Sequence, residues 1–150
     1  MSATIEEDEN ANELQFGNIN FEEVETLTND EMYLVLVKRH NAGVSNELFD
    51  QTFAYVERVA TTKINHDVEA LTLDLRQKLG YLTLQRVGDG KRIPLHKYEI
   101  SCLANFIKDD DTSVDEILSL VPSMSRFPVD QIEIAINIVT EAKERAGSGL

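Results

Sequence analysis

The side chains that could do chemistry are few in this 150-residue chain, and they are widely spaced. The candidates for metal binding or nucleophilic catalysis are one cysteine, Cys102, and three histidines, His40, His66 and His96. None of the histidines lies at a metal-ligand spacing from Cys102. Cys102 also lies beside Leu103 in an apolar helical pattern, which is typical of a small buried side chain. We therefore predict that the protein is not an enzyme and that it holds no metal or cofactor.

Two short motifs resemble ligand-binding loops only in part. Asp109-Asp110-Asp111 could attract a cation, but the spaced ligands and the central glycine of a calcium loop are missing. Acidic side chains are favourable near a helix N-terminus, so we expect these three to precede a helix. Gly88-Asp89-Gly90 has neither the lysine-serine ending of a phosphate loop nor a dinucleotide-binding glycine pattern, and it indicates a turn.

The charge of the chain is strongly acidic and unevenly distributed. Twenty-seven acidic and 14 basic residues give a net charge of −13, and residues 1–37 hold ten of the acids with no lysine or arginine. This charge argues against broad binding to duplex nucleic acid, which needs a basic face. A group of cations between Arg86 and Lys97 could contact phosphates, although solvated charges on an exposed loop explain it better. The longest apolar run, from Met32 to Val37, is too short to cross a membrane.

Residues 1–27 have the composition of an acidic arm. Within it, Leu14 and Phe16 alternate like one face of a short strand, and Ile19 and Phe21 follow. A two-stranded element is marginal by itself in water, so we expect this segment to need another surface. The alternative is a disordered, solubilising tail.

Residues 28–146 are predicted to form one helical domain, so the predicted fold class is all-α. Capping residues such as Thr28 and Ser113, with apolar side chains at helical spacing, predict helices near residues 28–40, 46–60, 68–79, 95–106, 113–121 and 128–146. An insertion at about residues 80–94 does not fit this pattern. Its alternating residues and the turn signal favour a β-hairpin or an extended loop, with a helix through residue 87 as the alternative. Residues 147–150 are predicted to form a flexible tail.

Two segments of this domain carry a family resemblance. Residues 95–105, Leu-His-Lys-Tyr-Glu-Ile-Ser-Cys-Leu-Ala-Asn, and residues 120–124, Leu-Val-Pro-Ser-Met, resemble the C-terminal core of the fourth subunit of RNA polymerase II. The acidic start of the arm and its pair Leu14 and Phe16 are also similar to that family, which includes the RNA polymerase III stalk subunit and the archaeal counterpart of both. The insertion is longer than is usual in the family, and Met124 replaces a leucine.

The resemblance implies a helical bundle similar to the helicase-and-RNase-D C-terminal (HRDC-like) domain, with an extended partner-binding arm. It implies a non-catalytic subunit of DNA-directed RNA polymerase II that acts in the nucleus, from which it could shuttle to the cytoplasm. The implied partner is the seventh subunit, which would form the stalk heterodimer with this chain and link it to the polymerase core. The implied role is transcription initiation and transcript handling, with weak or indirect contact with nascent RNA and no contact with a membrane.

The resemblance and the apolar pattern together give the candidate site residues. We expect the partner to contact apolar side chains of the arm and of the first helix: Leu14, Phe16, Phe21, Leu34 and Leu36. The residues of the family motif are expected to be mainly structural: Leu95, His96, Tyr98, Glu99, Leu103, Leu120, Pro122 and Ser123. Because a partner would complete the arm, we also expect the arm's apolar side chains to find no surface on the chain's own helices.

Two alternatives remain open at this point. The chain could be the stalk subunit of RNA polymerase III, which belongs to the same family. It could also be a free-standing helical module that binds nucleic acid, and in that case the isolated protein would bind single strands in a salt-sensitive way.

Overall fold

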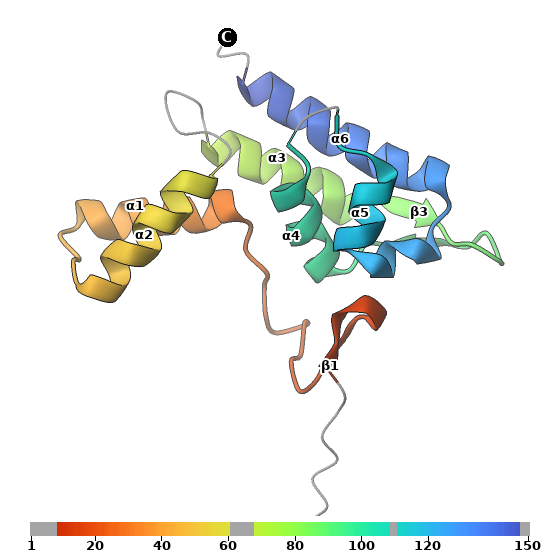
Figure 1. The fold of residues 1–150 in the computed structure, drawn as a ribbon, viewed down its shortest axis with the longest axis horizontal. Helices are drawn as coiled ribbons and strands as arrows, with labels where there is room; N and C mark the ends of the chain where they lie inside the picture. Colours follow the sequence, from red (N-terminus) through yellow and green to blue (C-terminus); the bar gives the residue numbers. More distant parts are fainter. Residues whose placement is uncertain (1–8, 61–67, 109–110, 148–150) are drawn as a thin grey trace, which may run out of the picture.

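The computed structural model describes residues 9–60, 68–108 and 111–147, and most of them are helical (Figure 1). This part of the chain contains six α-helices: α1 (Asn29–Asn41), α2 (Glu47–Val59), α3 (Val68–Tyr81), α4 (Lys97–Phe106), α5 (Val114–Leu120) and α6 (Val129–Gly147). It also contains two 3₁₀ helices, η1 (Ala11–Glu13) and η2 (Pro122–Arg126), and four short strands. The mainly helical fold is confirmed, and the strands form two short hairpins, one in the arm and one in the predicted insertion.

The starts of the helices follow from local capping. The hydroxyl of Thr28 accepts a hydrogen bond from the backbone of Glu31, and the carboxylate of Glu31 accepts one from the backbone of Thr28. Helix α1 therefore begins with the predicted capping box. The side chains of Asn46 and Ser113 accept hydrogen bonds from the third residues of α2 and α5 in the same way.

The insertion forms the expected β-hairpin. Strand β3 (Thr83–Gln85) pairs antiparallel with β4 (Arg92–Pro94). Leu84 is fully buried, so β3 is anchored in the core of the domain. Gly88 in the turn has φ of +100°, an angle that glycine adopts at little cost. Helix α3 continues to Tyr81, so the insertion begins later than predicted, and the alternative of a helix through residue 87 was wrong.

The arm is less extended than the sequence predicted. Strand β1 (Glu9–Asn10) pairs antiparallel with β2 (Gln15–Phe16) across η1, which makes a compact hairpin. Leu14, between η1 and β2, has φ of +59°, an uncommon angle for a bulky side chain. Element η1 lies against η2, so the arm hairpin contacts the C-terminal half of the chain. Residues 17–28 then run from β2 to α1, and we call this segment the strap.

The core of the domain lies among α3, α4, α5 and α6, with β3 at one end (Figure 1). Helices α3 and α6 pack along each other, and α6 buries apolar side chains at helical spacing: Ile132, Ala135, Ile136, Val139 and Ala142. The last helix extends to Gly147, and the rest of the predicted tail lies outside the described residues. No helix in the described part of the chain is long and apolar enough to span a membrane.

Helices α1 and α2 form a pair that stands beside this core (Figure 1). Helix α1 packs against α3, and α2 packs against α1. Stacked rings join the two helices, with the centroid of Phe53 on α2 lying 4.9 Å from that of His40 and 6.3 Å from that of Tyr33 on α1. Only Leu36 of α1 and Val56 of α2 are buried apolar residues, so the pair leaves much apolar surface uncovered.

Candidate partner-binding surface

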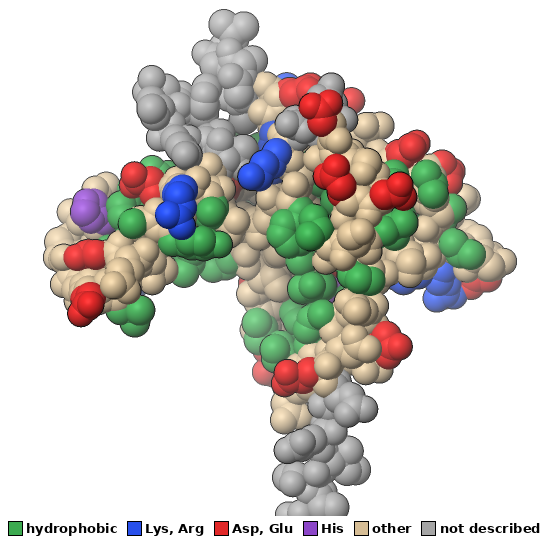
Figure 2. Space-filling model, in the orientation of Figure 1, with side chains coloured by type: hydrophobic (Ala, Val, Ile, Leu, Met, Phe, Trp, Pro, Cys, Tyr) green, Lys and Arg blue, Asp and Glu red, His purple; other side chains and the backbone are tan. Residues whose placement is uncertain are grey.

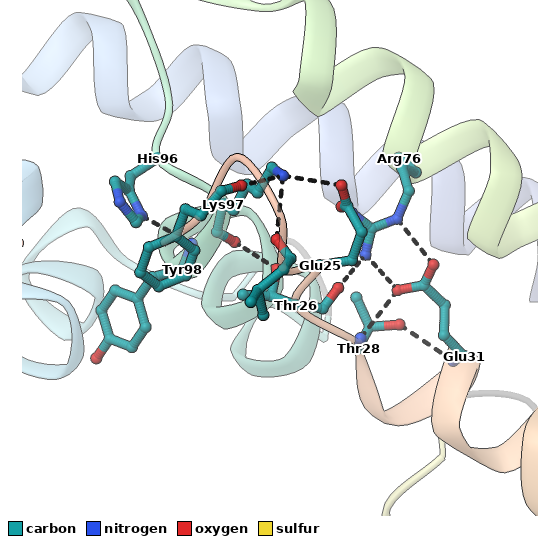
Figure 3. Close-up of polar contacts among 10 residues, drawn as sticks. Glu25, Thr26, Thr28, Glu31, Arg76, His96, Lys97 and Tyr98 are labelled. Carbon is teal, nitrogen blue, oxygen red and sulfur yellow. Dashed lines mark hydrogen bonds and ion pairs between the residues drawn. The ribbon is translucent and has the colours of Figure 1, made fainter. Parts of the chain in front are cut away.

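One lysine fastens the strap to the first turn of α4. The Nζ of Lys97 donates to the backbone carbonyl of Phe21 at 2.5 Å and to that of Val24 at 3.1 Å. It also pairs with the carboxylate of Glu25 at 2.8 Å, and this hydrogen bond is the main cause of the lowered pKa of Glu25. The hydroxyl of Thr26 donates to the Lys97 carbonyl at 2.9 Å (Figure 3). A single residue of α4 therefore holds the strap at four points.

A second cation, Arg76 on α3, holds the end of the strap next to α1 (Figure 3). Its guanidinium donates to both carboxylate oxygens of Glu31, at 2.5 and 2.8 Å, and to the backbone carbonyl of Thr26 at 2.6 Å. Desolvation opposes the ionisation of Glu31, but hydrogen bonds from Arg76 and Thr28 outweigh it and lower the pKa of Glu31. The hydrogen bond with Glu31 raises the pKa of Arg76. Both groups are thus charged at neutral pH.

Two phenylalanines of the arm pack on the N-terminal end of α4. The ring centroid of Phe16 lies 5.2 Å from that of His96 and 5.0 Å from that of Tyr98. The centroid of Phe21 lies 4.5 Å from that of His96 and 5.0 Å from that of Phe16. Both phenylalanines are half-buried. The expectation that the arm finds no surface on the chain's own helices is therefore wrong for Phe16 and Phe21.

An open cleft of about 730 Å³ lies between the arm and the domain, next to these rings. Leu14 and Phe21 line it from the arm, and Pro94, Leu95 and His96 line it from the domain. Leu14, the third predicted contact residue of the arm, is half-buried there. The arm therefore fills only part of the apolar surface that the domain offers it.

Apart from Phe21, the large apolar side chains of the strap are turned to the solvent. Ile19, Val24 and Leu27 are 54%, 44% and 51% exposed. Glu22 and Glu23, which lie between them in the sequence, are exposed as well. Apart from Phe21, which packs on His96, the described contacts that hold the strap on the domain are polar, so its other apolar side chains take little part in that attachment. Large exposed apolar side chains gathered in one segment are typical of a protein interaction site.

The predicted contact residues of α1 lie in different places. Leu36 is only 7% exposed, so its side chain lies inside the chain and is not available to a partner in this conformation, and Leu34 is half-buried. Val35 lies between them in the sequence and is 46% exposed. On α2, Leu48 and Tyr55 are also exposed. Figure 2 shows hydrophobic side chains at the surface of this helix pair and near the arm, with acidic side chains close by.

Two parts of the family motif meet at one buried carboxylate. Glu99 is fully buried, and it accepts hydrogen bonds from the backbone N–H of His96 at 2.8 Å and from the hydroxyl of Ser123 at 2.6 Å. Arg126 donates to both oxygens of the same carboxylate. The guanidinium of Arg126 also lies 4.4 Å from the ring centroid of Phe127. This carboxylate therefore ties the start of α4 to η2.

The other motif residues divide between the core and the surface. Leu95 and Leu103 are buried in the domain core. Pro122 begins η2 directly after α5, where the missing backbone N–H of proline suits the end of one helix and the start of the next. Leu120 is 51% exposed, so it contributes little to the core.

His96 caps α4 through an unprotonated ring nitrogen. Its Nδ1 accepts a hydrogen bond from the backbone N–H of Tyr98 at 3.0 Å, and a protonated nitrogen could not do so. Burial is the main cause of the lowered pKa of His96; Glu99 opposes this effect, while Arg126 and Lys97 add to it. The folded chain therefore favours neutral histidine at this position.

We expect acidification to destabilise the protein through His96. An unfolded histidine titrates near pH 6.5 and the folded one at a lower pH, so the unfolded state binds more protons as the pH falls below about 6.5. The free energy of unfolding, measured by urea denaturation, should therefore fall from pH 7.5 to pH 5.5. His96→Asn keeps a capping acceptor but does not titrate, so the variant should lose less stability over this interval. Equal losses in the two proteins would contradict this role of His96.

The other residues singled out for chemistry do not assemble into a site. In residues 9–60, 68–108 and 111–147, no group of three or more His, Cys, Asp or Glu is placed to hold a metal ion. Cys102 is half-buried, less than its pattern predicted, and burial raises the pKa of its thiol. His40 stacks on Phe53, whereas His66 and residues 109–110 lie outside the described residues.

The cations of the β3–β4 hairpin are partly engaged within the hairpin. Arg86 forms an ion pair with Asp89, and this contact is the main cause of the lowered pKa of Asp89, about 2. Arg92 donates to the hydroxyl of Thr83 at 3.1 Å and to its carbonyl at 2.7 Å. Lys91 is exposed beside them. This arrangement favours solvated loop charges over a continuous basic face.

Comparison with models of known protein families finds none that matches this chain.

Two arginines that organise the surface, Arg76 and Arg126, were not predicted from the sequence. Arg76 lies 45 residues from Glu31 and 50 from Thr26 in the sequence, so no local pattern indicates these contacts. Arg126 and Glu99 are 27 residues apart. The sequence did contain a signal for the start of α4, because His96 and Glu99 have the three-residue spacing of a capping box.

Proposed function

We propose that this protein is a non-catalytic subunit of RNA polymerase II, the counterpart of the fourth subunit, and that it binds the seventh subunit to form a stalk heterodimer. In this proposal its helical domain is HRDC-like, and it acts in the nucleus in transcription initiation and in transcript handling through its partner. The resemblance of residues 95–105 and 120–124 to that family supports the assignment.

The observation that carries the proposal is the exposure of apolar side chains on the strap. Polar contacts from Lys97 and Arg76 hold it on the domain, while Ile19, Val24 and Leu27 are exposed. Burying such side chains against a partner would favour association by ~25 cal/mol per Å² of apolar surface, less the cost of ordering the complex. A chain with exposed apolar residues on the strap and on α1 is well suited to act through binding rather than catalysis.

The geometry of the motif supports the resemblance in a second way. The two matching segments are separated in the sequence, yet Glu99 from the first accepts a hydrogen bond from Ser123 of the second. This hydrogen bond fixes how α4, which carries the first segment, packs against η2, which carries Ser123. This explains why the motif would carry a fold rather than a catalytic site.

Exposed strap residues allow a test that leaves the fold intact. We expect the double change Ile19→Asp and Leu27→Asp to weaken binding to the seventh subunit about a hundredfold or more, because both side chains would lose an apolar contact and place a carboxylate in its stead. Co-expression followed by affinity purification and calorimetry measures the loss. The strap is a better target than Phe16, since Phe16 also packs on α4 in the free chain.

Val129→Asp is the control, because Val129 is 56% exposed, lies at the start of α6 and takes part in none of the described contacts that hold the strap. This variant should bind as the unchanged chain does. Normal binding by the strap variant would refute the role of the strap. Purification of the endogenous assembly, with its subunits identified by mass spectrometry, tests the assignment itself: subunits specific to polymerase III, or no polymerase at all, would overturn it.

A further inference from the structure

We propose that the arm is a latch: residues 9–27 dock on α4 in the free chain and open as one unit while the helical domain stays folded. The docked arm shelters Phe16 and Phe21 on His96 and Tyr98. The latch rests on the proposed function only for the identity of the partner that captures the open arm.

The arm hairpin has few contacts that stabilise it by itself. Its ladder pairs two residues on each strand, which is marginal without further packing. Leu14 adopts a left-handed backbone angle that bulky residues rarely take. Phe16 and Phe21 are only half-buried, and the cleft of about 730 Å³ beside Phe21 is not filled by the arm.

Besides the ring contacts of Phe16 and Phe21, the contacts that close the latch are polar and partly accessible to water. The side chain of Lys97 is 31% exposed and that of its partner Glu25 is 65% exposed. Ion pairs of this kind are weak and are screened by salt. In contrast, Leu103 and Ile107 at the other end of α4 are fully buried in the core. Opening the arm should therefore cost much less than unfolding the domain, as is typical of segments that bind partners.

The docked and captured states of the arm compete. While Phe16 and Phe21 pack on α4, a partner that needs these side chains meets only the fraction of molecules with an open arm. Its apparent affinity is reduced by that fraction, and a change that opens the latch restores it. The same docking keeps two large aromatic side chains away from solvent before the partner arrives.

Lys97→Met provides the test, because it removes the charge of Lys97 and keeps the length of the side chain. In the isolated full-length chain, we expect amide hydrogen exchange in the strap and the arm hairpin to accelerate roughly tenfold to a hundredfold. This is the factor by which losing a charge-assisted hydrogen bond changes the equilibrium between the closed and the open arm. Amides of α6 should exchange as before, and added salt should accelerate the arm of the unchanged chain. Lys78→Met is the matched control: Lys78 is similarly exposed, at 35%, and pairs only with Asp74 of its own helix among the described contacts.

Two exchange results would overturn the latch. Exchange of the arm that accelerates only together with α6 would mean that the arm opens by global unfolding, and unchanged exchange in Lys97→Met would mean that Lys97 does not close it. Binding to the seventh subunit is measured separately. Tighter binding by Lys97→Met than by Lys78→Met supports competition, and equal or weaker binding refutes it. If no variant binds, the proposed function fails, and the latch is still decided by the exchange data.

Discussion

Replacing Glu99 with alanine is expected to lower the free energy of unfolding by about 3–5 kcal/mol. The carboxylate is fully buried and accepts hydrogen bonds from His96, Ser123 and Arg126. Its removal leaves the guanidinium of Arg126 without its counter-charge and the hydroxyl of Ser123 without its acceptor. Leaving buried donors unsatisfied costs more than the hydrogen bonds themselves contribute. Urea unfolding at pH 7, followed by circular dichroism, measures the loss.

The chain contains a natural control for this experiment. Glu31 is also the third residue of a capping box and is also held by an arginine, Arg76, but its side chain is 18% exposed, whereas that of Glu99 is fully buried. Water can replace part of its hydrogen bonding, so Glu31→Ala should cost only about 1–2 kcal/mol. A cost for Glu99→Ala no greater than this would contradict the structural role given to Glu99. Replacing Glu99 and Arg126 together with apolar residues should recover part of the loss.

The second large effect is a rise in stability at alkaline pH that depends on Lys143. This lysine is 5% exposed, and its Nζ donates to the backbone carbonyls of Ala104 and Ile107, which close the C-terminal end of α4. Burial lowers the pKa of Lys143 to about 8; Asp30 opposes this effect and Lys108 adds to it. In the unfolded chain a lysine titrates near pH 10.4.

The direction of the pH effect follows from these two pKa values. Between about pH 8 and pH 10.4 the folded chain has released this proton while the unfolded chain still holds it, so raising the pH favours the folded state. At about 1.4 kcal/mol per pKa unit, the contribution is about 3 kcal/mol. Tyr98 and Cys102, whose pKa values are raised mainly by burial, act in the opposite direction over part of this range.

A comparison of two proteins isolates the contribution of Lys143. The free energy of unfolding is measured for the unchanged chain and for Lys143→Met at pH 7 and at pH 10.5. Tyr98 and Cys102 are present in both proteins, so their effects cancel in the difference. The difference should shift by about 3 kcal/mol in favour of the unchanged chain as the pH rises. A constant difference would show that Lys143 titrates normally in the folded protein.

Local patterns in the sequence predicted the helices and the β3–β4 hairpin well, because caps and periodicity act over a few residues. Thr28 and Ser113 cap helices as predicted. The end of the third helix was the exception, since it was expected near residue 79 and α3 instead continues through Gly80 to Tyr81. Periodicity also overestimated the burial of Cys102, because an apolar stripe does not show which of its edges a neighbouring element covers.

The arrangement of the arm could not be predicted in the same way. Phe16 and His96 lie 80 residues apart, and only packing in three dimensions brings their rings together. The composition of the arm indicated a segment that packs on another surface, but it could not show that the chain supplies part of that surface itself. The way in which the docked strap lies on the domain, with Ile19 and Leu27 exposed, likewise follows from contacts of Lys97 and Arg76 that are distant in the sequence.

The way in which the strap is attached has a consequence for its evolution. Lys97 and Arg76 hold it largely through the main-chain oxygens of Phe21, Val24 and Thr26, and every amino acid carries such an oxygen. Substitutions at the outward positions can therefore accumulate among orthologues without detaching the segment. The partner preference of the strap could then change during evolution while its attachment to the domain stays the same.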